Sequence, residues 1–85
     1  MLKRDDLMKT MSFFEFKHHY YKNYSRGTVR MGQLFILVFM KGNTSKYDYL
    51  WNEEDDTLAE DLIYRLIFSW NWDSMSMRVV NEELL

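Results

Sequence analysis

The sequence predicts an all-α fold, a small bundle of three to four helices with a flexible or extended C-terminal tail. The central observation is an uninterrupted apolar run, Leu34–Met40, which must be buried. On both sides of this run, aromatic and aliphatic residues recur at helical spacing. Serine and threonine precede these stretches at positions typical of helix N-caps. With 85 residues, of which 47% are hydrophobic, the chain is expected to form a single domain over residues 1–85.

The first predicted helix covers about residues 13–25. Ser12-Phe-Phe-Glu15 has the form of a capping box, in which serine and glutamate bond each other's backbone amides. Phe13, Phe16, Tyr20 and Tyr24 then follow at helical spacing, and Phe14 and Tyr21 are expected to widen this apolar stripe. The preceding residues 1–11 are expected to be a weakly ordered N-terminal extension.

The second predicted helix covers about residues 29–41 and contains the apolar run. Thr28 can cap its start, and Lys41-Gly42 can end it. A helix that is apolar on every face belongs at the centre of a bundle. The single Gly32 near its start is explained by close helix packing.

A third, short helix over about residues 46–53 has a serious alternative. As a helix, this segment places Tyr47, Leu50 and Trp51 on one side. As a strand, it alternates Tyr47, Tyr49 and Trp51 on one face. The alternative fold is therefore α+β, with a β-hairpin over residues 34–51, and sequence alone leaves both open.

The fourth predicted helix covers about residues 58–71. Thr57-Leu-Ala-Glu60 reads as a second capping box. Its expected apolar face has one row of Leu58, Leu62, Leu66 and Trp70, and Ala59, Ile63 and Ile67 lie beside it. The tail, residues 73–85, alternates weakly and is expected to form an edge strand or an ordered coil.

Three stretches resemble a group of small uncharacterised tailed-phage accessory proteins. They are Ser12-Phe-Phe-Glu-Phe16, Arg30-Met-Gly-Gln-Leu-Phe35, and Glu54-Asp-Asp56 followed by Trp70 or Trp72. The second stretch is similar to the Arg-x-Gly-Gln-x-x-Phe helix start of that group, with its phenylalanine one position earlier. The Asn and Pro usual after that element are absent. The resemblance, over about residues 11–72, implies an all-helical fold and a phage origin, and no known activity.

Charge is distributed unevenly although the net charge is only −2. Residues 1–46 contain nine basic and three acidic residues, whereas residues 47–85 contain two basic and ten acidic residues. Such asymmetry concerns partners and self-association more than fold. The two halves can also simply attract each other within one domain.

The densest charge cluster predicts a protein-binding surface. Acidic side chains at 53–56, 60 and 61 can engage a basic groove by imitating phosphate charge, and neighbouring aromatic residues can anchor the contact. The predicted partner-binding residues are Tyr49, Trp51, Glu53, Glu54, Asp55, Asp56, Glu60 and Asp61. We therefore expect a phage-type accessory protein that inhibits a host nuclease or defence complex, in the manner of an anti-CRISPR protein.

The alternative function is a small nucleic-acid-binding or transcription-modulating module. Its cations would hold phosphates while neighbouring tyrosines stack on bases. The residues are Lys17, Lys22, Arg26 and Arg30. The negative net charge makes this the second hypothesis.

Other classes are disfavoured. No arrangement of nucleophile and base marks an enzyme, and no motif indicates a cofactor or small-molecule substrate. His18 and His19 point about 100° apart on a helix, which disfavours a shared metal. The apolar run is far shorter than the roughly 18–20 residues that cross a bilayer. We expect a cytoplasmic protein, and leave open whether it forms a homo-oligomer.

Overall fold

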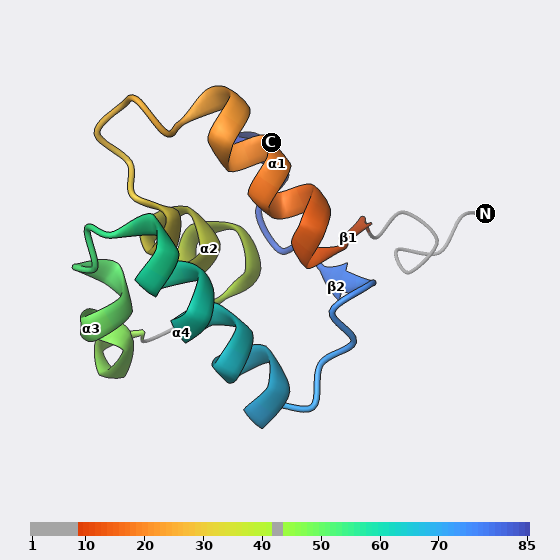
Figure 1. Cartoon of the computed structure of the whole chain (residues 1–85). Helices are drawn as coiled ribbons and strands as arrows, with labels where there is room; N and C mark the ends of the chain where they lie inside the picture. Colours follow the sequence, from red (N-terminus) through yellow and green to blue (C-terminus); the bar gives the residue numbers. More distant parts are fainter. Residues whose placement is uncertain (1–8, 42–43) are drawn as a thin grey trace.

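A computed structural model describes residues 9–41 and 44–85 and has the predicted helical bundle (Figure 1). Its elements in chain order are β1 (Thr10–Met11), α1 (Phe13–Asn23), α2 (Met31–Phe39), the 3-10 turn η2 (Ser45–Tyr47), α3 (Asp48–Trp51), α4 (Asp56–Ser69), β2 (Met77–Arg78) and the 3-10 turn η3 (Glu82–Leu84). The all-α prediction is confirmed. The hairpin alternative over residues 34–51 is wrong, because residues 31–39 and 45–51 are helical.

Helix α2 is the centre of the bundle, as its apolar sequence predicts. It contacts α1, α3, α4 and η3. The side chains of Leu34, Phe35 and Val38 are fully buried. Leu37 is the exception, with 39% of its surface exposed.

The start of α2 differs from the prediction. The helix begins at Met31, with Arg30 rather than Thr28 as its N-cap residue. The backbone amide of Arg30 donates to the side-chain oxygen of Gln33 at 3.0 Å, which satisfies an amide that the helix itself leaves free.

Close packing of α2 against α3 depends on Gly32. A Cβ atom at this position would overlap the backbone carbonyl oxygen of Leu50 and would lie 2.9 Å from its Cδ1. Leu50 is itself completely buried. The expectation that Gly32 serves helix packing is confirmed.

Helix α1 begins at the predicted capping box. The amide of Glu15 donates to Ser12 Oγ at 2.9 Å, and the amide of Ser12 donates to Glu15 Oε1 at 2.8 Å. Phe13, Phe16 and Tyr20 form the buried row of the helix. Phe16 packs edge-on against Phe35, with 5.7 Å between ring centroids.

Helix α4 begins two residues earlier than predicted, and the capping box at Thr57 is not formed. Asp55 is the N-cap residue, and its Oδ1 accepts from the amides of Thr57 at 2.8 Å and Leu58 at 3.2 Å. Aspartate is among the strongest N-cap residues, so Asp55 fixes the helix start before Thr57 can.

Of the two adjacent apolar rows predicted for α4, the second faces the core. The residues turned to the core are Ala59, Ile63 and Ile67, whereas Leu58 is 53% exposed. The expected row of Leu62, Leu66 and Trp70 is half-buried at the flank. The small residue Ala59 is fully buried in the first turns of α4.

The end of α4 directs the chain back to the core. Asn71 adopts a left-handed conformation (φ 61°), its amide donates to Phe68, and the amide of Trp72 donates to Ile67 at 3.0 Å. This is the Schellman pattern of helix termination, with asparagine where glycine is usual. It places Trp72 against Phe35, with 6.4 Å between ring centroids.

The tail is extended, as predicted, and is part of the core. β2 pairs antiparallel with β1, at the opposite end of the described chain (Figure 1). Met77 and Val79 are buried, and the amide of Val80 donates to the carbonyl oxygen of Val38 at 2.9 Å.

The predicted N-terminal extension lies mostly outside the described residues, because only positions 9–11 of it are described. In residues 9–41 and 44–85, no helix is long and apolar enough to cross a membrane.

Candidate protein-binding face

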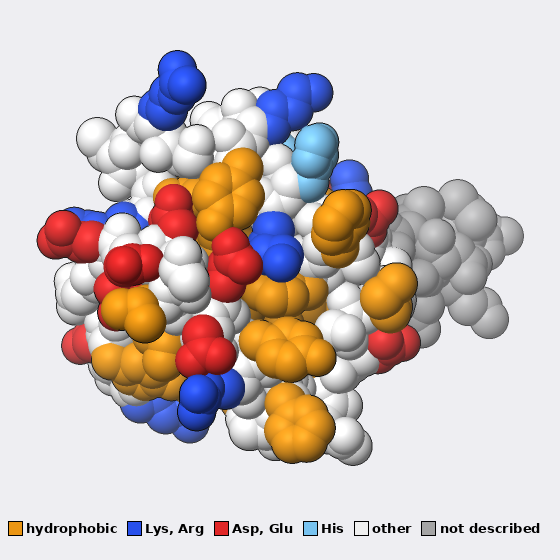
Figure 2. All heavy atoms as spheres, in the orientation of Figure 1, with side chains coloured by type: hydrophobic (Ala, Val, Ile, Leu, Met, Phe, Trp, Pro, Cys, Tyr) orange, Lys and Arg blue, Asp and Glu red, His pale blue; other side chains and the backbone are white. Residues whose placement is uncertain are grey.

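Most predicted partner-binding residues lie on α3, the loop after it, and the first turns of α4. We call the carboxylates of this region the acidic face: Glu53, Glu54, Asp55, Asp56, Glu60 and Asp61. Figure 2 shows acidic side chains gathered over α3 and the first half of α4, with hydrophobic side chains between them. The structure therefore brings the predicted cluster together on one side of the molecule.

Two of these carboxylates fix the loop before α4. Asp55 caps the helix, and its own amide donates to Glu53 Oε2 at 3.0 Å. Their backbone bonds hold the loop in one shape, so both residues have a local structural role besides their charge.

Asp56 and Glu60 are turned toward α1. The hydroxyl of Tyr20 donates to Asp56 Oδ1 at 3.0 Å. The hydroxyl of Tyr21 donates to Glu60 Oε2 at 2.5 Å, and Lys17 Nζ lies 3.4 Å from Glu60 Oε1. These contacts join the basic half of the chain to the acidic half, so the two halves do attract each other within one domain.

The two tyrosines that bond to the acidic face are held in their neutral form. Burial, and then the bond to Asp56, raises the pKa of Tyr20 to about 12. Burial, and then the bond to Glu60, raises the pKa of Tyr21. If either tyrosine lost its proton, its negative charge would lie beside a carboxylate in a partly desolvated contact. Repulsion between the two like charges disfavours that form.

Glu54 and Asp61 are two exposed members of the acidic face. The Glu54 side chain is 81% exposed, and its Oε2 lies 3.8 Å from Arg30 Nη2. The Asp61 side chain is 56% exposed and bonds Arg65 Nε at 2.8 Å, one helical turn away. Exposed ion pairs of this kind contribute only about 0–1 kcal/mol, so these carboxylates can exchange partners readily.

Of the two predicted aromatic anchors, only one is open. Tyr49 is 50% exposed, whereas Trp51 is half-buried and packs against the core. Leu58, expected in the core, is exposed between Asp55 and Asp61 on α4. The helical pattern did not reveal it, because the rotation of α4 follows from tertiary packing.

The four basic residues of the alternative hypothesis are divided by the structure. Lys17 and Arg30 are paired with Glu60 and Glu54. Lys22 and Arg26 are exposed, and neither forms an ion pair with another residue in 9–41 or 44–85.

The tyrosines expected to stack on bases are occupied. Tyr20 is buried, and the hydroxyl of Tyr24 donates to the carbonyl oxygen of Leu84 at 2.8 Å. Tyr21 remains 43% exposed, beside a hollow that Lys22 and Arg26 also line.

Exposed aromatic side chains also lie on α1 and α4. Phe14 is 74% exposed, Phe68 81% and Tyr64 56%. Phe14 was expected to widen the core stripe. Its position one residue after the buried Phe13, about 100° around the helix, is the signal that could have placed it outside.

Within the described part of the chain, no group of three or more His, Asp or Glu residues could hold a metal ion. The Nε2 atom of His19 instead lies 3.0 Å from the carbonyl oxygen of Leu84.

Comparison with protein families, with curated proteins and with solved structures finds no match to this chain.

Proposed function

We propose that this chain is a phage-type accessory protein that acts by binding another protein through its acidic face, rather than by catalysis. The expected partner is a host nuclease or defence complex with a basic groove for nucleic acid. Binding there would inhibit the partner by occlusion, in the cytoplasm of the host. The phage origin rests on the sequence resemblance described above.

One observation supports this proposal most strongly. The acidic face contains six carboxylates, and only Lys17, Arg30 and Arg65 form ion pairs with it among the described residues. Three of its negative charges therefore have no cationic partner among the described residues, and two apolar residues of the same segment, Tyr49 and Leu58, are exposed. Charged residues surrounding an apolar contact are typical of binding surfaces, where the charge steers the approach and the apolar centre excludes water.

The proposal is tested by reversing charge where the fold does not need it. Glu54→Lys with Asp61→Lys changes two exposed carboxylates and spares Asp55, which caps α4, and Asp56, which accepts from Tyr20. A matched control is Glu82→Lys with Glu83→Lys, the same change on exposed residues of η3. All three proteins are used to capture partners from a host lysate.

We expect the Glu54/Asp61 variant to lose the captured protein and the η3 variant to retain it. Equal capture by both variants would refute the assignment of the binding surface. Displacement of the captured protein by duplex DNA would support occlusion of a nucleic-acid groove.

The second candidate function, nucleic-acid binding, is favoured only by the exposed pair Lys22 and Arg26. A gel-shift experiment at low salt decides it, because phosphate-driven affinity is greatest there. Lys22→Gln with Arg26→Gln should abolish any shift. The absence of a shift for the unchanged chain would remove this candidate.

A further inference from the structure

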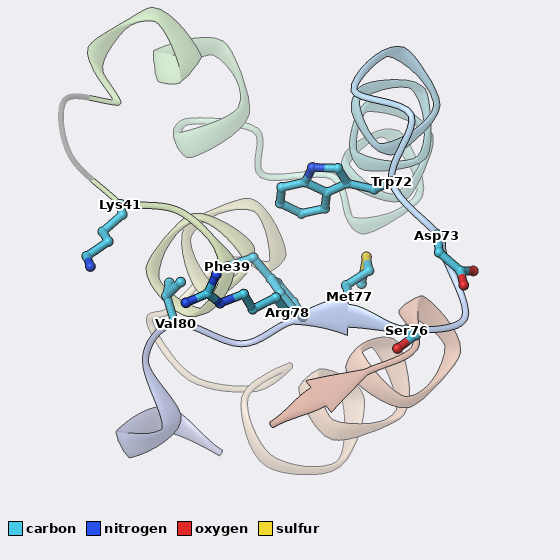
Figure 3. Close-up of a pocket in the computed structure, with 8 residues that line it drawn as sticks. All are labelled: Phe39, Lys41, Trp72, Asp73, Ser76, Met77, Arg78 and Val80. Atoms are coloured by element: carbon cyan, nitrogen blue, oxygen red, sulfur yellow. The ribbon is translucent and has the colours of Figure 1, made fainter. Parts of the chain in front are cut away.

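A cavity of about 490 Å³ lies beside β2, and none of the residues that line it belongs to the acidic face (Figure 3). Its walls come from the end of α2, the segment after α4, and β2 with the residues that follow it. Trp72 and Val80 supply accessible apolar surface over a floor formed by the buried Phe39 and Met77, and Lys41 and Arg78 supply positive charge. The volume falls within the range of about 300–1,000 Å³ that is usual for small-ligand sites.

The apolar part of the cavity is preformed. Phe39 and Met77 are 3% and 1% exposed and are fixed by the core. Trp72 is fixed by the Schellman turn at Asn71 and by its contact with Trp70, at 4.7 Å between ring centroids. A flat or branched apolar group could therefore enter without reorganising these side chains.

The charged part of the cavity is suited to an anion. Arg78 and Lys41 are exposed and form no ion pair with any residue in 9–41 or 44–85. The one carboxylate on the rim, Asp73, accepts from the amide of Met75 at 2.9 Å and is turned away from the Arg78 side in Figure 3. The charges available to a ligand are thus a planar guanidinium and an ammonium.

The backbone of β2 adds a hydrogen-bond donor beside the cavity. Met77 pairs with Met11, and the amide of Val79 donates to the carbonyl oxygen of Lys9 at 2.9 Å. Since neighbouring residues of an antiparallel strand turn their amides to opposite sides, the amide of Arg78 faces away from β1. Besides its guanidinium, Arg78 therefore has a backbone N–H donor that is not used in pairing with β1.

We propose that this cavity binds a carboxylate attached to an aromatic or branched apolar body. The carboxylate pairs with Arg78, whose fork of N–H donors matches the two oxygens, while Lys41 adds a second charge. The apolar body lies against Trp72 and Val80. Both a free organic acid and the C-terminal residue of a polypeptide present this chemistry.

The experiment uses phenylacetate as the probe and phenylacetamide as its neutral isostere. Binding to the full chain is followed by two-dimensional NMR, through the backbone amide of Arg78 and the indole N–H of Trp72. We expect phenylacetate to bind with a Kd on the order of 1 mM, and phenylacetamide at least about tenfold more weakly.

Variants locate the site independently of the probes. Arg78→Gln should weaken phenylacetate binding at least about tenfold, whereas Arg65→Gln, the same change on α4, should leave it unaltered. The amide spectrum of each variant verifies that it is folded. The proposal is overturned if neither probe shifts the two signals, if both bind equally, or if Arg78→Gln binds as well as the unchanged chain.

Two further probes distinguish the sources of the carboxylate. A tripeptide ending in phenylalanine is compared with phenylacetate and with its own C-terminal amide. Tighter binding of the free-acid peptide supports a polypeptide C-terminus. Weaker binding than phenylacetate supports a free organic acid. These outcomes are independent of the acidic face, because neither the probes nor Arg78→Gln touches it.

Discussion

At the scale of single residues, a few positions carry exact geometric demands. Gly32 allows α2 to approach the backbone of Leu50, Asn71 reverses the chain after α4, and Tyr20 carries a buried hydroxyl onto Asp56. Each of these features depends on the side chain, or the lack of one, at a single position, so one substitution can remove it. Two of them give direct predictions.

Gly32→Ala should destabilise the fold strongly. The added methyl group would overlap a backbone carbonyl, which cannot move without shifting α3, so we expect a loss of at least about 2 kcal/mol. Chemical denaturation measures the free energy of unfolding. The control is Gly27→Ala, where the added Cβ meets only Tyr24 O at 3.5 Å and the change should stay within about 1 kcal/mol. Equal effects of the two substitutions would contradict the packing argument.

Tyr20 predicts a loss of stability in alkaline solution. Its pKa is about 12 in the folded protein and near the ordinary value of 10.0 when unfolded, so the folded state retains the proton more tightly. The stability that this difference provides is complete below pH 10 and is lost as the pH rises from there through 12.

The alkaline prediction is checked by measuring unfolding free energy against pH for the unchanged chain and for Tyr20→Phe. Removing the hydroxyl should flatten the decline between pH 10 and 12, although Tyr21 contributes part of it. Identical slopes for the two proteins would show that Tyr20 titrates normally.

At the scale of elements, helix ends decide which side chains reach the acidic face. Asp55 rather than Thr57 caps α4, and this moves the helix start and sets which residues of the first turn face α1. Asp56 and Glu60, one helical turn apart, consequently both contact that helix.

Asp55→Ala should cost about 1 kcal/mol, because two amides of the first turn lose their acceptor. Thr57→Ala should have little effect, since Thr57 lies inside the helix and alanine is the better helix former. Thermal unfolding of the two variants measures the difference. A larger loss for Thr57→Ala would mean that the helix begins where the sequence pattern placed it.

The sequence predicts those elements whose signals are local. Ser12 and Glu15 cap each other within four residues, so the start of α1 was predictable, and the run of apolar residues identified α2 as central. The buried row of α4 was not predictable, because the helix has two adjacent apolar rows and only the fit against α2 decides which of them is buried.

The candidate sites, too, could be predicted only in part from the sequence. The cluster of acids was evident in the sequence, but its bonds to Tyr20, Tyr21 and Lys17 depend on α1 lying beside α4. The cavity beside β2 depends on a tail whose weak alternation does not reveal that Met77 is buried. Contacts between distant segments leave no periodic signal in either segment.

At the scale of the whole molecule, the tail and the helices form one structure. Met77 is 1% exposed within the core that α1, α2 and α4 build, and β2 pairs with residues 66 and 68 positions earlier. The chain is small, so each buried side chain is a substantial part of its stability.

Met77→Ala should therefore destabilise the entire domain by about 2–5 kcal/mol. Met75→Ala is the matched control, because Met75 is 74% exposed two residues away. Circular dichroism and tryptophan fluorescence should report one shared transition in both variants. Separate transitions, or equal stability of the two variants, would show that the tail is not part of the same cooperative unit.

The central claim, that the acidic face binds a basic partner, is tested most directly by measuring affinity for the captured protein against ionic strength. For the unchanged chain, we predict at least about a tenfold loss of affinity between about 50 mM and 500 mM salt, because screening weakens exposed charge contacts. The Glu54→Lys/Asp61→Lys variant should bind weakly at low salt and lose this dependence. An affinity that is independent of salt, and unchanged by the two charge reversals, would contradict the account.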